Sequence, residues 1–285
     1  MSRSMRTYYY AVAGAMGGLI AWRASDLVGL SFTRNLYLNE VIVGALIGLC
    51  IGLMIGATEG MVTLSLRRAA RSALYAAPIG MLAGALALPL SEVAFQALGG
   101  EALARVLGWS LFGLMIGLAE GVTGRTQSWK GALGGALGGA LGGALLVAAQ
   151  LRLDNPVLGK ALGLVVLGAC IGAFIALISV LLSRAWLQVV SGKLRGAEFV
   201  LDKYLRAGGP SAILGSDAFK ADISLPDPDI SPQHALLSSA GTHLTLKDLS
   251  LKGTFVNNRK VELATLADRQ TIRLGNTELV YHERR

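Results

Sequence analysis

The chain has 285 residues, of which 53% are hydrophobic and only 15% are charged, with 37 glycines and a mean hydropathy of +0.55. This composition excludes an ordinary soluble domain and is typical of membrane proteins. The net charge of +8 comes mainly from Lys and Arg beside apolar segments, which argues against a nucleic-acid-binding patch. Cys50 and Cys170 lie in apolar runs without the spacing of a disulfide framework or a metal site.

Six stretches with few or no charges predict an α-helical, polytopic membrane domain over residues 1–183. A hydrocarbon core of about 30 Å requires about 20 apolar residues in a helix, so most of them can span and the first is marginal. The stretches are 7–22, 41–61, 72–90, 103–122, 131–151 and 157–183. With the N-terminus inside, the inner connections carry about twice as many Lys and Arg as the outer ones. The sequence therefore predicts a multi-pass protein of the cell membrane with both termini in the cytoplasm.

A glycine motif followed by a glutamate recurs in the membrane domain. Gly52-Leu-Met-Ile-Gly56 precedes Glu59, and the same five residues, Gly113-Leu-Met-Ile-Gly117, precede Glu120. A weaker third copy covers residues 168–172. Because two spans separate successive copies, the pattern predicts three tandem helical hairpins of the same orientation.

Glycines also recur at every fourth position, which gives several of these helices a flat stripe without side chains. Such stripes let two backbones approach closely, and this packing holds helices together in lipid. A pore or a lipid groove lined by the stripes is the alternative, and packing is favoured because it is the more general use of small residues in membranes. The candidate packing residues are Gly44, Gly48, Gly52, Gly56, Gly113, Gly117, Gly135 and Gly139.

Glu59 and Glu120 are the only acids at equivalent places in the repeat. An ionisable group inside the bilayer is a candidate for proton or ion transport. The alternative places both glutamates at the cytoplasmic interface, where they pair with arginines of the loops, such as Arg125. We favour the interface because no further acid, His or Lys continues a relay through the membrane.

The C-terminal part, residues 198–285, is expected to form an all-β sandwich. Its short alternating runs are separated by Pro, Asp, Ser, Gly and Asn, which is the pattern of strands with a period of two. The expected strands are 199–206, 211–214, 222–225, 235–237, 243–247, 254–256, 270–274 and 277–282. Residues 184–197 are expected to be a juxtamembrane linker, either amphipathic on the headgroups or without structure of its own.

Two spaced motifs in this part resemble the forkhead-associated (FHA) domain. They are Ser231-Pro-Gln-His234 and, about twenty residues later, Ser250-Leu-Lys-Gly253-Thr254-Phe-Val-Asn257. The resemblance covers about residues 198–285. It implies a β-sandwich whose loops at one end recognise phosphothreonine in partner proteins, and it gives the candidate partner-binding residues Ser216, Ser231, His234, Ser250, Lys252, Gly253, Thr254 and Asn257.

The resemblance implies a role for each motif residue. Ser231 would bind the phosphate, His234 would brace the loop, and Asn257 would hold the peptide backbone. The family's two arginines are missing, because Ser216 and Pro232 occupy their positions. A phosphate dianion needs several charge-assisted donors, which Lys252 and Lys220 replace only in part. Two alternatives stand: an altered phosphopeptide site, or docking through other surfaces, and we favour the second slightly.

These observations predict a membrane-anchored docking or scaffold protein rather than an enzyme, without cofactor or metal. The expected partners are a cytoplasmic protein or phosphoprotein, such as the substrate of a Ser/Thr kinase in a signalling or secretion assembly. The lipid bilayer and other membrane subunits or a second copy are also expected partners. The alternative is a channel or transporter with the FHA-like domain as its regulatory module. A structural subunit of a larger membrane complex is a third possibility.

Overall fold

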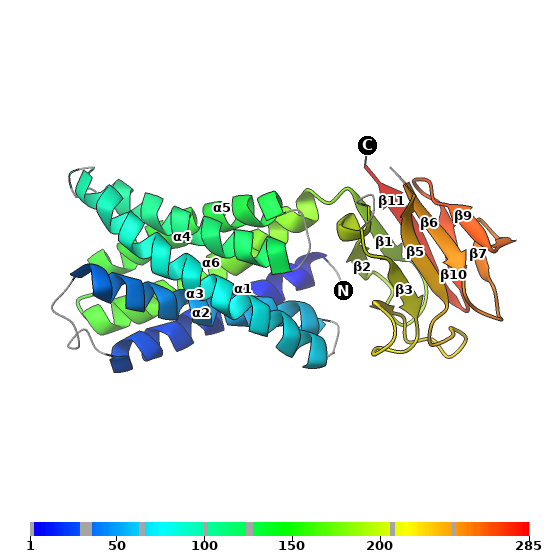
Figure 1. Cartoon of the computed structure of the whole chain (residues 1–285), viewed down its shortest axis with the longest axis horizontal. Helices are drawn as coiled ribbons and strands as arrows, with labels where there is room; N and C mark the ends of the chain where they lie inside the picture. Colours follow the sequence, from blue (N-terminus) through cyan, green and yellow to red (C-terminus); the bar gives the residue numbers. More distant parts are fainter. Residues whose placement is uncertain are drawn as a thin grey trace. The chain divides into compact units, whose positions relative to one another are not determined.

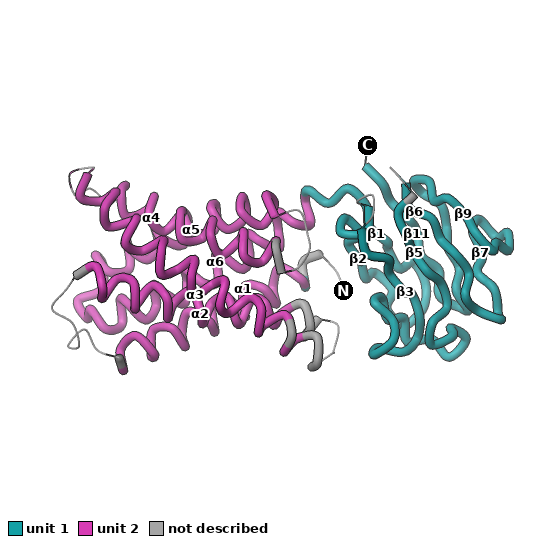
Figure 2. Tube along the Cα trace, in the orientation of Figure 1, with its two compact units in different colours: residues 1–5, 63–65, 182–285 teal, residues 6–62, 66–181 magenta. Residues whose placement is uncertain are grey.

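The computed structural model describes residues 3–28, 36–62, 66–97, 99, 102–123, 128–205, 209–240 and 243–284. The chain divides into two compact units (Figure 2). The helical unit comprises residues 6–62 and 66–181, and the second unit consists mainly of residues 182–285, which we call the β unit. Figure 1 labels the helices and strands of both units.

The helical unit contains the six predicted helices. They are α1 (Arg3–Val28), α2 (Leu36–Val62), α3 (Leu66–Ala97), α4 (Ala102–Thr123), α5 (Ser128–Arg152) and α6 (Pro156–Leu181). In the described residues, five segments within α2 to α6 are long and apolar enough to cross a membrane. Helix α1 is not one of them, which agrees with its marginal apolar stretch.

The helices bury glycines where they pack against one another and expose many large apolar residues on their outer side, unlike the helices of a soluble bundle. Helix α5 shows this most clearly, because its paired glycines from Gly134 to Gly143 are buried. Its exposed positions are leucines that recur every four residues: Leu133, Leu137, Leu141 and Leu145, each more than 40% exposed. Only an apolar surrounding makes such a surface favourable, because apolar area in water is costly.

Bare backbone at the glycines lets three helix pairs lie close together. A β-carbon added at these positions would collide with the backbone of the facing helix. The contacts are Gly44 with Gly84 and Gly48 with Gly80 between α2 and α3, Gly113 with Gly135 and Gly117 with Gly131 between α4 and α5, and Gly14 with Gly168 between α1 and α6. Among the other predicted packing glycines, Gly52 and Gly56 face Ala76 of α3, and Gly139 faces Trp109 of α4.

The interior of the helical unit is filled by residues at equivalent positions of α2, α4 and α6. Ile51, Phe112 and Ile171, which are separated by the offsets of the sequence repeat, are all 0% exposed. One turn further along the helices, Ile55, Ile116 and Ile175 are 1–2% exposed. These apolar residues belong to a single hydrophobic cluster, so the middle of the unit is a packed core.

The β unit is a sandwich of two sheets, as predicted. One sheet has the order β2-β1-β11-β10-β7-β8 and the other β4-β3-β5-β6-β9. The strands are β1 (Ala185–Val189), β2 (Glu198–Val200), β3 (Ala212–Gly215), β4 (Ile223–Ser224), β5 (Ala235–Ala240), β6 (His243–Asp248), β7 (Thr254–Val256), β8 (Arg259–Val261), β9 (Leu263–Thr265), β10 (Thr271–Leu274) and β11 (Thr277–Glu283). Alternate residues of both sheets form one core between them, for example Leu187, Leu214, Leu246 and Leu279.

The structure differs from the prediction at the start of the β unit. Residues 185–189, expected in a linker, form β1 and pair with both β11 and β2. Ala185, Leu187 and Val189 alternate into the core, a period of two that also fits a short amphipathic segment. The domain therefore begins at about Ala185 rather than at residue 198.

The expected strand over residues 199–206 is also shorter than predicted. It ends at Val200 and is followed by a 3₁₀ helix, Asp202–Tyr204. The Asp202 side chain accepts hydrogen bonds from the backbone amides of Arg184 and Ala185, at 2.7 and 3.0 Å. This carboxylate turns the chain away from the sheet, because it ties the segment to the beginning of β1.

Candidate functional site

Four strand ends bring the predicted partner-binding loops together at one end of the sandwich. Strand β5 pairs antiparallel with both β3 and β6, and Ala235 lies opposite Leu214 on one side and Asp248 on the other. The end of β3, the start of β5 and the end of β6 therefore share one edge. Strand β7 begins at Thr254, directly after the β6–β7 loop, so this loop connects the two sheets at the same edge.

His234 connects two of these loops. Its side chain is 0% exposed, and its Nδ1 accepts a hydrogen bond from the Ser231 backbone N–H at 3.1 Å. This contact places the proton of the neutral ring on Nε2, which faces the Gly253 carbonyl at 3.3 Å and Ser250 Oγ at 3.1 Å. Burial lowers the pKa of His234, and the hydrogen bond to Gly253 opposes this only in part. The neutral ring therefore connects both loops through these hydrogen bonds.

Asp248 organises the second loop, and the sequence analysis did not single it out. Its Oδ1 accepts hydrogen bonds from the Ser250 amide at 3.1 Å, the Ser250 hydroxyl at 3.0 Å and the Thr254 hydroxyl at 2.8 Å. Partial burial acts to raise the pKa of Asp248, but these hydrogen bonds outweigh it and the pKa is lowered. The hydroxyls of Ser250 and Thr254 thus point into the domain and hold the loop.

Gly253 completes this loop with a backbone that few other residues adopt. Its φ of +88° lies in the left-handed region, which is costly for residues with a β-carbon. The Gly253 amide donates a hydrogen bond to Ser250 Oγ at 2.9 Å. The tight turn therefore keeps the Gly253 carbonyl directed at His234.

Ser216 occupies the position of the first missing arginine and fastens the loop that precedes β5. Its hydroxyl donates to the Ile230 carbonyl at 2.8 Å, and its amide donates to the Ser231 carbonyl at 3.0 Å. The neighbouring Gly215 lies against Pro232, whose carbonyl occupies the place of a β-carbon. Ser216 is therefore a structural contact between β3 and the Ser231 loop.

The solvent-facing part of this end presents few polar groups to a partner. The half-buried Ser231 hydroxyl makes no hydrogen bond to any other described residue. The Lys252 ammonium lies 3.4 Å from Asp229 Oδ1, with both side chains about half exposed. Leu251 beside it is 102% exposed, and Phe219 in the β3–β4 loop is 83% exposed. The surface thus combines the Ser231 hydroxyl, the paired Lys252 and the exposed polar side chains of Lys220 and Gln233 with bare apolar side chains.

Asn257 lies at the other end of β7 from this loop. It begins the β7–β8 turn with a φ of 48°, and its side-chain oxygen accepts the Thr271 amide at 3.0 Å. Three strand residues separate it from Gly253, which corresponds to four steps along the strand or about 13 Å. The structure therefore does not place Asn257 with the other candidate residues.

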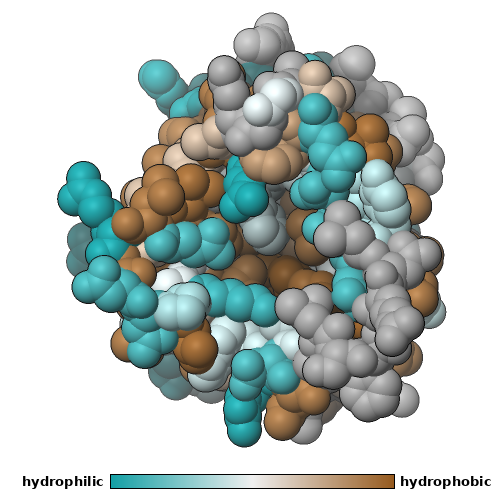
Figure 3. Space-filling view, turned by 90° about the vertical axis from the view of Figure 1, so that its left-hand side faces the viewer, coloured by the Kyte–Doolittle hydropathy of each residue, from teal (hydrophilic) through white to brown (hydrophobic). Residues whose placement is uncertain are grey.

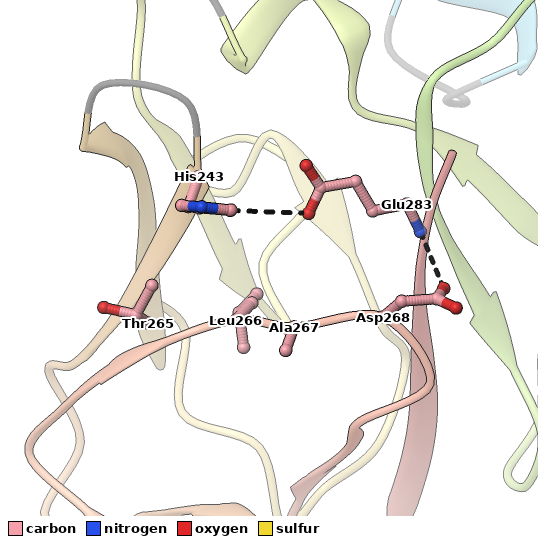
Figure 4. Close-up of a pocket in the computed structure, with 6 residues that line it drawn as sticks. All are labelled: His243, Thr265, Leu266, Ala267, Asp268 and Glu283. Atoms are coloured by element: carbon pink, nitrogen blue, oxygen red, sulfur yellow. Dashed lines mark hydrogen bonds and ion pairs between the residues drawn. The ribbon is translucent and has the colours of Figure 1, made fainter. Parts of the chain in front are cut away.

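A hollow of about 550 Å³ lies at the opposite end of the sandwich (Figure 4). His243, at the start of β6, points toward the Glu283 carboxylate with 3.8 Å between Nδ1 and Oε2. The Glu283 amide donates to Asp268 Oδ1 at 2.9 Å. No group of three or more metal-ligating side chains suited to hold a metal ion occurs in the described residues.

The structure describes the side chain of only one of the two predicted intramembrane acids, Glu120. Glu120, in α4, accepts a hydrogen bond from the Tyr10 hydroxyl of α1 at 3.0 Å, and Tyr10 is 2% exposed. The pairing of Glu120 with an arginine of the loops stays a prediction. The Glu59 side chain falls outside the described part of the structure.

Comparison with known proteins supports the resemblance carried by the loops. The FHA domain family profile matches residues 212–275. The FHA domain of the CT664 protein from Chlamydia trachomatis is 36% identical, over 36% of this chain and 100% of that chain, with a TM-score of 0.32. The Rv1747 FHA-1 domain of Mycobacterium tuberculosis is 27% identical, over 36% of this chain and 99% of that chain, with a TM-score of 0.29.

A third FHA domain, solved in a study of phosphothreonine-dependent interactions, is 33% identical over 36% of this chain and 98% of that chain, with a TM-score of 0.31. A search of curated proteins found no match. The profile match agrees with the β-sandwich, with the Ser231–His234 motif and with the Gly253 turn. The C-terminal part of this chain is therefore an FHA domain.

Proposed function

We propose that this protein is a membrane-anchored docking protein whose FHA domain recruits a cytoplasmic partner. FHA domains are interaction modules that bind phosphothreonine peptides. The observation that carries the proposal is the His234 brace, which holds two loops rigidly while it leaves Ser231, Leu251 and Lys252 at the surface. A preorganised loop surface lowers the entropic cost of binding a partner.

The outer surface of the helices supports the membrane anchor. Leucines cover the exposed side of α5, and α1 exposes Val12, Met16, Leu19 and Ile20. The opposite side of α1 packs against α6 at Gly14 and Gly18. Helix α1 therefore has one face suited to lipid and one suited to the bundle, which makes it the sixth span. Six spans, together with the excess of Lys and Arg in the inner connections, support a topology with both termini in the cytoplasm.

The partner is bound with little dependence on phosphate. Two arginine positions of the family hold Ser216 and Pro232, and the Ser216 hydroxyl is used by the Ile230 carbonyl. Lys252 is already close to Asp229, which weakens its attraction for an anion. The exposed Leu251 offers an apolar anchor instead, the kind of contact that carries much of the energy at interfaces.

Peptide titration of residues 182–285 tests this reading, because this fragment has its own core. An array of phosphothreonine peptides and their unphosphorylated forms would be measured by fluorescence anisotropy. We expect pairs to differ by less than about threefold, since both arginines of the family are missing and the exposed lysines Lys220 and Lys252 are point charges rather than bidentate donors. A phosphopeptide that binds more than about tenfold tighter than its partner, a difference of about 1.4 kcal/mol, contradicts phosphate independence.

Docking itself is tested with the full-length protein by crosslinking in cells. Leu251→Asp places a charge on the proposed surface, and Leu263→Asp is the matched control because Leu263, on β9, is 66% exposed. Partners captured by the wild-type protein and by the control should be lost with Leu251→Asp. Equal capture by both variants would show that the partner uses another surface.

The transport alternative has less support. The packed apolar layers around Ile51, Phe112 and Ile171 leave no polar path through the middle of the described helices. The Glu120 carboxylate accepts a hydrogen bond from the Tyr10 hydroxyl of α1, a contact that ties two helices together. An ion-flux assay on the reconstituted protein distinguishes the docking protein from the transporter. Ion flux that is lost in Glu120→Gln would favour the transporter.

A further inference from the structure

A cavity of about 280 Å³ lies at the end of the helical unit where α2, α4 and α6 begin. Five helices line it, from α2 to α6. Figure 3 looks onto this end and shows hydrophilic residues around a hollow with hydrophobic residues at its bottom. In the proposed topology this end faces the outside of the cell, away from the cytoplasmic loops.

Charges of both signs face this cavity. Glu40 and Glu92 come from α2 and α3, whereas Arg105 and Lys160 come from α4 and α6. In the described structure, none of the four forms an ion pair. Glu92 accepts a hydrogen bond from Gln96 at 3.0 Å, and the Arg105 guanidinium lies 4.6 Å from the centre of the Phe95 ring. Arg105 is exposed and the other three are partly exposed, so water still reaches the set. Four charges that converge on one cavity at the end of a membrane bundle make it a candidate ligand site.

The inner wall of the cavity is apolar and closed. Ile47, Trp109 and Leu164 line it below the charges. One turn deeper, Ile51 and Phe112 are 0% exposed, so the cavity ends there. Its volume is at the lower limit of ligand pockets, which fits a small molecule rather than a peptide or a lipid chain. The site is therefore built to hold a small ligand and not to pass it on.

We propose that this cavity binds an apolar α-amino acid in its zwitterionic form. The ammonium group would lie between Glu40 and Glu92, and the carboxylate would face Arg105 and Lys160. The apolar side chain would contact the inner wall, which gives it a surface removed from water. A ligand with both charges satisfies all four side chains at once, whereas a ligand with one charge leaves an opposite pair unpaired.

The test uses the full-length protein in dodecyl maltoside and measures binding by equilibrium dialysis. The probes are L-leucine, 3-methylbutylamine, which lacks the carboxylate, and 4-methylpentanoate, which lacks the ammonium group. We expect saturable binding of one leucine per chain and at least about tenfold weaker binding of each analogue, since each loses a charge-assisted contact.

Single-charge variants separate the two halves of the site. Glu40→Gln should weaken leucine and the amine by about tenfold and leave 4-methylpentanoate unchanged. Arg105→Gln should weaken leucine and 4-methylpentanoate and leave the amine unchanged. Arg152→Gln is the control, because Arg152 is an exposed cation in the last turn of α5, near the same end, and does not line the cavity.

The analogue series keeps the test decisive even where a variant fails to fold, because it uses the wild-type protein. Absence of saturable leucine binding up to about 10 mM overturns the proposal. Equal binding of leucine and both analogues also overturns it, since the charges would then play no part. Leucine binding that Arg152→Gln weakens as much as Arg105→Gln would show a general charge effect instead of this site.

Discussion

Replacement of His234 by Ala should destabilise the FHA domain strongly. The substitution removes the acceptor of the Ser231 amide and the donor that faces Gly253 and Ser250. Each lost hydrogen bond costs about 1 kcal/mol, and a partly buried amide without a partner costs about 1 kcal/mol or more. The ring is also completely buried, so its removal leaves a cavity that costs about 1 kcal/mol or more. Together the loss is about 4 kcal/mol, a large part of a small domain's typical stability of roughly 5–15 kcal/mol.

Urea denaturation of residues 182–285 measures this change, with Trp186 as the single tryptophan of the fragment. Trp186 stacks on His282 at 5.0 Å, so its fluorescence reports the folded state of the sheet. His243→Ala is the matched control, because this histidine is 40% exposed and lies 3.8 Å from Glu283. The control should lose less than about 1 kcal/mol. A His234→Ala domain as stable as the control would refute the brace.

Three further outcomes are expected. Because the pKa of His234 is lowered in the folded domain, the unfolded chain binds a proton at a higher pH than the folded chain does. The free energy of unfolding should therefore fall as the pH is lowered from about 7 to 5. His234→Gln should remove this part of the pH dependence in urea titrations. Gly253→Ala should cost about 1–2 kcal/mol in the same assay, because its φ of +88° strains any residue with a β-carbon. Gly135→Leu should lower the thermal unfolding temperature of the detergent-solubilised protein, because Gly113 leaves no room, whereas Ala144→Leu on the exposed side should not. Equal unfolding temperatures for these two variants would contradict the close packing of α4 and α5.

Local patterns were sufficient to predict the two architectures. Long apolar segments predicted the six helices, and the alternation around Leu244 and Leu246 predicted a strand with one buried face. The same alternation in Ala185–Val189 was too short to separate a strand from an amphipathic turn. The segment is a strand because it pairs with β11, which lies almost a hundred residues away in the sequence.

The sequence predicted only those residues of the candidate site that lie at positions of the FHA motifs. The spacing from Ser231 to His234 indicated the bracing histidine. The role of Asp248 in holding the β6–β7 loop could not be predicted from the sequence. It depends on three hydrogen-bond donors that the folded loop directs at one carboxylate oxygen. The cavity charges were hidden for a similar reason: Glu40 and Lys160 lie on different helices, and only packing brings them to one space.

The bare backbones between α2 and α3 also restrict how the helices can move. A slide of one or two residues would take each glycine of this seam away from the small residue that it now faces. The next position at which Gly44 and Gly48 again meet small residues is four residues away, a step of about 6 Å. Sliding of α2 along α3 would therefore occur only in steps of this size. In any smaller motion the two helices would move together as one rigid body.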